Sequence, residues 1–290
     1  MLLEPATMRK LDALALGARR AFTGASKGEK RSRKRGSSVE FADFREYNLG
    51  DDIRRLDWAA YGRFEKLFLK QFLEEEDVDL TLLLDTSLSM SYGEPSKLLA
   101  AQRLAAAVGY IGLKGFDRVT AANFDQTLRN RFAPARGQGA AHRLFNFLEE
   151  QTAAGSAELA PPMKRFASTV QRGGIALVFS DFLLPEGYET GLKILASRGF
   201  EVTAVQILSR EELEPTLVGD LKLVDAETGE LREVSISSRL LQTYKKKLDE
   251  HTNGLKKFCR SYDMNYLLVP SDIEVETAVL KLLRGEGVVK

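Results

Sequence analysis

Oxygen-bearing side chains gather at two points of the sequence where an apolar run ends. Asp85 opens the stretch Asp85-Thr-Ser87-Leu-Ser89, whose alternation can point the first, third and fifth side chains toward one spot. Asp181 follows a second apolar run. Carboxylates and hydroxyls are the hard oxygen ligands that Mg²⁺ or Mn²⁺ prefers. These four residues indicate a site for a divalent cation, with open positions for water or for a partner's carboxylate.

The two apolar runs predict the strands that position these carboxylates. Residues 80–84 and 175–179 are strand-sized and almost uninterrupted by polar residues, as expected for parallel strands covered on both faces. In a doubly wound sheet, ligands gather at the carboxyl ends of the strands, where the strand order reverses. Asp85 and Asp181 fall at such ends. The competing interpretation is that both aspartates only cap the helices that follow.

Strand and helix patterns alternate from residue 78 onward. Ser96 can cap a long helix that runs through residue 112, and residues 119–124 and 128–132 read as a strand with a hairpin arm. Further helices and strands follow, up to a closing helix over 275–284. This order predicts an α/β domain over residues 78–290, with a doubly wound, mostly parallel sheet and helices on both faces. A hairpin insertion is expected near 221–234, because turn residues separate two short apolar segments there.

Residues 1–77 form an N-terminal extension of a different character. An amphipathic helix is indicated over 8–22, and the basic run Lys27–Arg35 follows it. Residues 39–76 mix aromatic side chains with charges of both signs and lack a clean period. We therefore expect an irregular extension that leads into the α/β domain.

The overall composition disfavours several classes of function. Lys and Arg number 42 against 41 Asp and Glu, a net charge of +1, so no global field attracts nucleic acid. A nucleic-acid-binding function would rest on Lys27–Arg35 alone, and that run has no interleaved aromatic residues. The apolar runs are too short to span a bilayer and the N-terminus lacks a signal-peptide pattern. With a single cysteine, Cys259, no intramolecular disulfide can form, and we expect a cytoplasmic protein.

The sequence is poorly equipped for catalysis. It contains neither a Gly-x-x-x-x-Gly-Lys-Ser/Thr phosphate loop nor a Gly-x-Ser-x-Gly nucleophile elbow. One cysteine and two histidines also argue against most zinc enzymes. The enzyme alternative that stays open is a magnesium-dependent phosphoesterase that uses Asp85 and Asp181.

The Asp-x-Ser-x-Ser string at the end of a buried strand resembles the metal-ion-dependent adhesion site of von Willebrand factor A domains. In that family, a threonine from a later loop and an aspartate after the fourth strand complete the site. Asp181 matches that aspartate, and Ser156 matches the threonine best, with Thr152 a nearby rival. The resemblance therefore implies a sheet of von Willebrand factor A type, with the following ligands for weakly bound Mg²⁺ or Mn²⁺: Asp85, Ser87, Ser89, Ser156 and Asp181.

The extension carries a second resemblance. The segments Gly36-Ser-Ser-Val-Glu-Phe41, Arg45-Glu-Tyr47, Gly50-Asp-Asp-Ile-Arg54 and Leu56-Asp-Trp58, followed by Gly62-Arg63, resemble the signature of domain-of-unknown-function family fifty-eight. That family joins this signature to a von Willebrand factor A-like fold, and the resemblance covers about residues 24–283. Members are commonly encoded beside MoxR-type AAA+ ATPases and are thought to act with them. The resemblance implies a non-catalytic protein-binding module with a MoxR-type ATPase as its partner.

Charged and aromatic residues of the extension could contact such a partner. Arginine and aromatic anchors are typical of interface hot spots, although an internal network of ion pairs would use the same residue types. Both interpretations stay open at the level of sequence. The candidate partner-binding residues are Arg45, Asp51, Asp52, Arg54, Arg55, Asp57 and Trp58.

Overall fold

The chain divides into two compact units, one of residues 1–25 and 78–290 and one of residues 26–77. The computed structural model describes residues 2–12, 39–47, 56–64, 66–74, 78–184, 187–216, 219–224 and 229–283. In this division the residues from 78 onward and the first residues of the chain fall in the larger unit.

The larger unit is built on a six-stranded sheet in the order β10-β7-β6-β3-β4-β5. Neighbouring strands are parallel except at the edge, where β5 runs antiparallel to β4. In chain order, β3 is the first strand of this sheet. Strands β4 and β5 follow on one side of β3, and β6 then lies on its other side. The predicted doubly wound, mostly parallel sheet is therefore confirmed. Its strands are β3 (Asp79–Asp85), β4 (Arg118–Phe124), β5 (Leu128–Ala135), β6 (Ile175–Ser180), β7 (Glu201–Leu208) and β10 (Asn265–Pro270).

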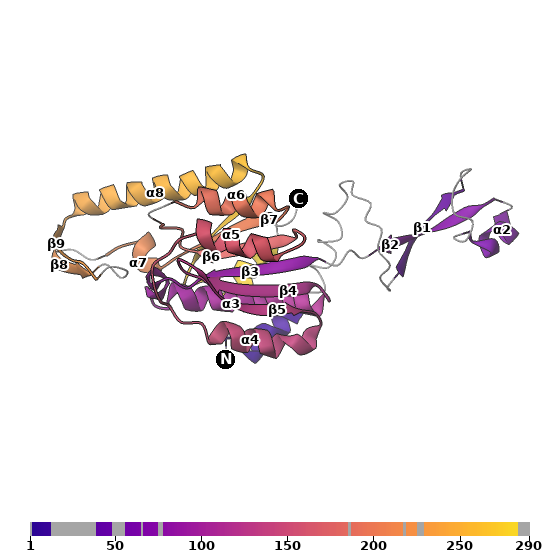
Figure 1. Cartoon of the computed structure of the whole chain (residues 1–290), viewed down its shortest axis with the longest axis horizontal. Coiled ribbons are helices and arrows are strands. Elements are labelled where there is room, and N and C mark those ends of the chain that lie inside the picture. The colour runs from indigo at the N-terminus through magenta and orange to yellow at the C-terminus, as the bar shows by residue number, and fades with distance from the viewer. Residues whose placement is uncertain are drawn as a thin grey trace. The chain divides into compact units, whose positions relative to one another are not determined.

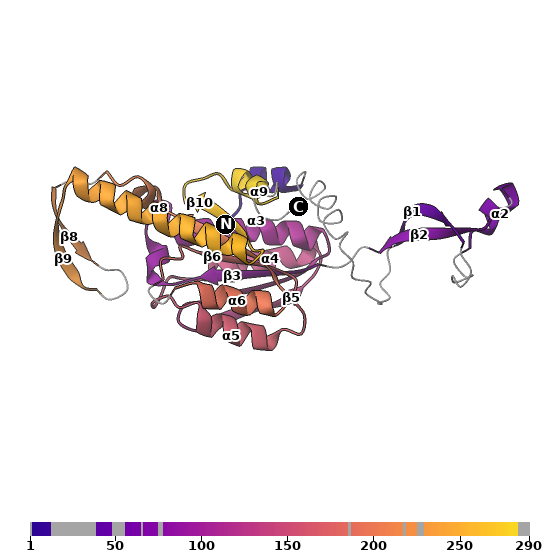
Figure 2. The same cartoon turned by 90° about the horizontal axis from the view of Figure 1, so that it is seen from above.

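Helices cover both faces of this sheet, as Figures 1 and 2 show. Alternate side chains of β3 enter two separate apolar clusters: Leu82 and Leu84 enter one, and Leu83 enters the other. The first cluster includes α3 (Lys97–Lys114), α4 (Ala141–Glu149) and α9 (Val275–Leu283). The second includes α5 (Ala160–Thr169), α6 (Glu189–Ser197) and α8 (Ser238–Ser261). Short helices η2 (Leu88–Ser91), η3 (Gln138–Ala140) and α7 (Arg210–Leu213) lie in the connections.

The first residues of the chain complete the first apolar cluster. A helical segment over 5–12 follows Leu2 and Leu3, and these leucines and Leu11 are buried with α3 and α9. Asp12 Oδ1 accepts a hydrogen bond from the Tyr110 hydroxyl of α3 at 2.7 Å. The segment packs here because these leucines remove apolar surface of the larger unit from water. The rest of the helix expected over 8–22 lies outside the described residues.

The unit of residues 26–77 contains a hairpin that the sequence pattern does not show. Strand β1 (Val39–Glu46) pairs antiparallel with β2 (Phe68–Glu74), and α2 (Trp58–Phe64) lies between them in the chain. The register shifts between Phe41 and Asp43. Such a bulge breaks the two-residue alternation by which a strand is read from sequence. The basic run Lys27–Arg35 lies outside the described residues.

The hairpin expected near 221–234 is present and leads into α8. Strands β8 (Gly219–Val224) and β9 (Leu231–Ile236) pair antiparallel. Among the residues described, none of the helices combines the length and apolar character that crossing a membrane requires.

Candidate functional site

The structure brings Asp85 and Asp181 to neighbouring strand ends. Asp85 is the last residue of β3 and Asp181 follows β6, and the strand order reverses between these two strands. Their exposed fractions are 0% and 1%. Ser180, at the end of β6, donates a hydrogen bond from its hydroxyl to Asp85 Oδ2 at 2.6 Å. This is the position at which doubly wound sheets bind ligands.

The turn after β3 brings the two serines of the Asp-x-Ser-x-Ser string together. Asp85 Oδ1 accepts a hydrogen bond from the backbone N–H of Ser87 at 2.9 Å. This contact folds the chain over the carboxylate, and η2 begins directly afterwards. The hydroxyl oxygens of Ser87 and Ser89 lie 3.1 Å apart. The two serine hydroxyls therefore lie together in the turn that follows β3.

The loop that contains Ser156 runs beside this turn. The Gly155 carbonyl accepts from the Leu88 N–H at 2.9 Å, and the Ala154 N–H donates to the Thr86 carbonyl at 2.7 Å. Gly155 has φ +74°, and a Cβ there would lie 3.0 Å from a carboxylate oxygen of Asp125, so glycine suits this close approach.

Ser156 directly follows these backbone contacts, and its hydroxyl accepts a hydrogen bond from the Gln126 amide. Thr152, the rival for the threonine position, is exposed and precedes the contacts. Ser156 therefore follows the backbone contacts with this turn, whereas Thr152 precedes them.

The surroundings of Asp85 disfavour its negative charge. Burial, together with the nearby charge of Asp181, raises the pKa of Asp85 to about 6. Hydrogen bonds from Ser180 and Ser87 oppose this rise. The negative charge of Asp85 is therefore under-compensated, and a cation placed against it would favour the ionised form.

Asp181 already has a cationic partner, which the sequence analysis missed. The Lys97 ammonium donates to Asp181 Oδ2 at 2.7 Å and to Glu212 Oε1 at 2.6 Å, and its side chain is only 1% exposed. Burial would lower the pKa of Lys97, but these two carboxylates outweigh it and hold the pKa above its ordinary value. The other oxygen of Asp181, Oδ1, accepts from the Leu183 N–H at 3.0 Å. Lys97 is therefore a charged member of the site.

Two features of the sequence bear on this lysine, although neither identifies its partners. Lys97 is the first residue of α3, where the positive end of the helix dipole disfavours a cation unless an acid lies nearby. Glu212 belongs to a Ser-x-x-Glu capping box: Ser209 accepts from the Glu212 N–H at 3.1 Å, and Glu212 Oε2 accepts from the Ser209 N–H at 2.8 Å. That capping box fixes the carboxylate that reaches Lys97. The distance of 115 residues between the partners conceals the pair in the sequence.

The donor set at the site fits a hard divalent cation. Every candidate ligand is a carboxylate or hydroxyl oxygen, and the Lys97 ammonium shows that Asp181 is placed to receive positive charge. In the part of the chain that the structure describes, no group of three or more His, Cys, Asp or Glu side chains could enclose a metal. The site would therefore rely on serine hydroxyls and two carboxylates, which is an open arrangement rather than a closed cage.

A third strand-end aspartate is engaged elsewhere. Asp125 follows β4 and accepts from the Thr127 N–H at 2.8 Å. It also forms an ion pair with Arg129. Burial would raise its pKa, but Arg129 and Thr127 hold the pKa below its usual value. Asp125 is thus a structural carboxylate that fixes the turn between β4 and β5.

The candidate partner surface of the extension is described only in part. Asp57 accepts from the Ala60 N–H at 3.2 Å and so caps α2. Trp58 is 66% exposed and Tyr61 is 45% exposed, with their rings edge to face at 6.4 Å between centroids. Arg45 lies in β1, but its side chain is outside the description. Outside the described residues altogether lie Asp51, Asp52, Arg54 and Arg55.

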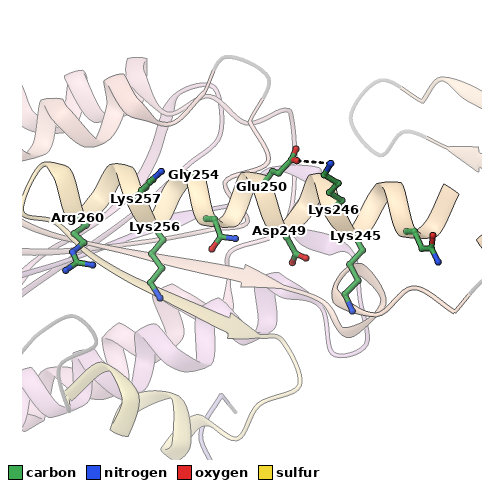
Figure 3. A pocket seen from close by; sticks show the side chains of 10 residues that line it. Lys245, Lys246, Asp249, Glu250, Gly254, Lys256, Lys257 and Arg260 are labelled. Atoms are coloured by element: carbon green, nitrogen blue, oxygen red, sulfur yellow. Dashed lines mark ion pairs between the residues drawn. The ribbon is translucent and has the colours of Figure 1, made fainter. Parts of the chain in front are cut away.

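A separate open groove follows one side of α8 (Figure 3). Its lining mixes lysines with acidic side chains, and Lys246 and Glu250 pair at 3.9 Å within it. The mixture does not provide a uniform track of positive charge for a phosphate backbone. None of the candidate site residues lines this groove, whose residues are Gln242, Lys245, Lys246, Asp249, Glu250, Asn253, Gly254, Lys256, Lys257 and Arg260.

Comparison with known proteins identifies relatives of the whole chain. The uncharacterized protein Rv1480 of Mycobacterium tuberculosis is 27% identical over 274 residues, which cover 93% of this chain and 86% of that protein. Among solved structures, the conserved hypothetical protein BatB from Bacteroides thetaiotaomicron has a TM-score of 0.46 at 15% identity, over 72% of this chain and 98% of that one. The VWA domain of SpRpn10 has a TM-score of 0.39 at 14% identity, over 73% and 99%.

A family model agrees with the signature found in the extension and the domain. The model described as "Protein of unknown function DUF58" matches residues 43–254. That match covers most of the chain and spans both the charged extension and the strand ends that carry Asp85 and Asp181. The chain belongs to the DUF58 family.

Proposed function

We propose that this chain is a non-catalytic protein-binding module with a weak Mg²⁺ or Mn²⁺ site. One observation carries the proposal: two buried strand-end carboxylates lie at the reversal of strand order, beside two hydroxyl oxygens 3.1 Å apart. Asp85, Ser87, Ser89, Ser156 and Asp181 would hold the ion. A bound ion would supply an open coordination position that a carboxylate of a partner protein can fill.

The state of the charged groups favours binding over catalysis. A phosphoesterase needs a group that is free to activate a nucleophile or to protonate a leaving group. Asp125 is paired with Arg129, and the amino group of Lys97 lies between two carboxylates. The ring of His251 contacts the Phe182 carbonyl at 3.0 Å, so it fixes the loop after Asp181. Asp125, Lys97 and His251 are thus each engaged in a structural contact.

The partner in this proposal is a MoxR-type AAA+ ATPase, which the family resemblance suggests. The proposed metal site would lie at the carboxyl ends of the central strands β3 and β6, and the extension offers exposed Trp58 and Tyr61. Each surface gives a separate prediction. A cytoplasmic location would place the module beside such an ATPase.

Titration calorimetry should detect weak binding of Mg²⁺ or Mn²⁺ to the wild type and no binding to Asp85→Ala. The alanine removes one of the two carboxylates of the site. Open sites with few carboxylates bind divalent cations weakly, so the loss of one should abolish measurable binding. Asp79→Ala is the matched control, because Asp79 begins the same strand at the opposite edge of the sheet. Equal heats from wild type and Asp85→Ala would remove the metal assignment.

Trp58→Ala should weaken the complex with the ATPase and leave stability almost unchanged. A side chain that is 66% exposed contributes little to the core, so we expect the free energy of unfolding to change by no more than about 0.5 kcal/mol. Phe116→Ala is the control, since Phe116 is 64% exposed but lies in the larger unit. Pull-down and denaturant unfolding measure the two quantities. A large loss of stability with binding intact would instead assign Trp58 to internal packing.

A further inference from the structure

The Lys97 ammonium occupies an unusual place for a lysine. It is fully buried and lies between a candidate metal ligand and an acid that is not a candidate ligand. The bond to Asp181 is 2.7 Å and the bond to Glu212 is 2.6 Å. One ammonium is thus shared between two carboxylates on different connections of the sheet, one after β6 and one in α7.

Charge balance indicates what this sharing does. Asp85, Asp181 and Glu212 provide three carboxylates against the single ammonium of Lys97, so two negative charges remain when all are ionised. A divalent cation supplies the missing charge. When it binds Asp181, the ammonium can keep its bond to Glu212 and release Oδ2 of Asp181. A lysine paired with Asp181 alone would have no such second acceptor.

Glu212 is well placed to be that second acceptor. Its other carboxylate oxygen, Oε2, accepts from the Ser209 N–H at 2.8 Å, so the side chain is held by its own capping box. Gly93, in the turn before α3, packs closely on Ser209, and a Cβ there would lie 2.6 Å from the Ser209 Cβ. The segments that carry Lys97 and Glu212 are therefore fixed against each other. The ammonium could therefore release Asp181 and keep its bond to Glu212 without a movement of the backbone.

We propose that Lys97 is a resident counter-ion that competes with a divalent cation for Asp181, and that Glu212 retains the ammonium when the cation binds. Lys97 and Glu212 would then be positioning residues that set the affinity of the site. This inference rests on the metal site of the proposed function and goes further, because it names two residues outside the ligand set that control occupancy.

Titration calorimetry with Mn²⁺ on matched variants tests the inference. Lys97→Met removes the competitor and should tighten Mn²⁺ binding by about tenfold or more, because a positive charge next to the ion is lost. Glu212→Gln should have the opposite effect and weaken binding by roughly threefold, because the ammonium is left to Asp181 alone. Glutamine keeps an oxygen for the Ser209 N–H, so the capping box is retained.

Glu212 could change Mn²⁺ affinity in two ways, by holding the Lys97 ammonium or by its own negative charge. A double-mutant cycle separates the two effects. In the Lys97→Met background, Glu212→Gln should change the Mn²⁺ dissociation constant much less than it does in the wild type. Thermal unfolding gives a second readout. Excess Mn²⁺ should raise the Tm of Lys97→Met more than that of the wild type, because tighter binding to the folded state stabilises it more.

Each outcome has a defined meaning, with Asp85→Ala as the variant that lacks the metal site. If Asp85→Ala loses binding but Lys97→Met binds Mn²⁺ as the wild type does, the role of Lys97 is refuted while the metal site stands. If Lys97→Met does not fold, Glu212→Gln decides, and unchanged or tighter binding in that variant refutes the inference. An absence of Mn²⁺ binding in every variant overturns both the inference and the metal site.

Discussion

Replacing Lys97 with methionine should lower the free energy of unfolding by about 3–5 kcal/mol when no divalent metal is present. Methionine is similar in length to the lysine stem, so it leaves little cavity. It cannot neutralise Asp181, which is 1% exposed, or Glu212, whose side chain is 14% exposed. Removing one partner of a buried ion pair is costly because the other charge stays buried without compensation. Urea unfolding in EDTA measures the change.

The control for this prediction is an exposed lysine with a comparable ion pair. Lys222 lies 3.0 Å from Glu233 in the β8–β9 hairpin, but the two side chains are 73% and 78% exposed. Lys222→Met should change stability by no more than about 1 kcal/mol, because water screens the pair and solvates the remaining carboxylate. A loss equally small for Lys97→Met would show that water or protons reach Asp181 when the ammonium is absent.

The sequence predicts the framework of the site because that framework depends on local patterns. Uninterrupted apolar runs indicate strands buried on both faces, and an aspartate directly after such a run must lie at the carboxyl edge of the sheet. Asp85 and Asp181 meet because β3 and β6 are neighbours at the reversal of strand order. Ser87 and Ser89 converge because the turn is folded by a local hydrogen bond, from the Ser87 N–H to the Asp85 carboxylate two residues earlier. Each of these steps needs little information beyond the adjacent residues.

The features that the sequence does not reveal depend on contacts between distant segments. A lysine near a helix start is ordinarily solvated, and only the arrival of Asp181 and Glu212 makes burial of Lys97 tolerable. The packing of Leu2, Leu3 and Leu11 on α3 and α9 likewise depends on where the last helix lies. Strand β1 escapes detection for a local reason, since a bulge between Phe41 and Asp43 disrupts its alternation.

Removing the metal should abolish binding of the MoxR-type ATPase if a partner carboxylate completes the coordination of the ion. We expect the loss with EDTA and in Asp85→Ala and Asp181→Ala, and recovery when Mg²⁺ is restored to the wild type. The expected weakening is about 100-fold or more, because the contact exists only through the ion and each alanine removes one of its two carboxylates. Surface-immobilised ATPase with the chain as analyte measures the dissociation constants.

Asp181→Ala needs its own control, because it also leaves Lys97 with Glu212 as its only carboxylate partner. Asp181→Asn keeps one oxygen, which can accept from the Leu183 N–H or from the ammonium but not at both positions, and it removes the charge that holds a divalent ion. If the complex depends on the metal, asparagine should be as damaging as alanine, although the protein is more stable. If the ATPase binds as tightly in EDTA and to all three aspartate variants, the ion is not the contact. Trp58 and its neighbours in the extension would then be the contact, and Asp85 and Asp181 would serve only to organise the turns at their strand ends.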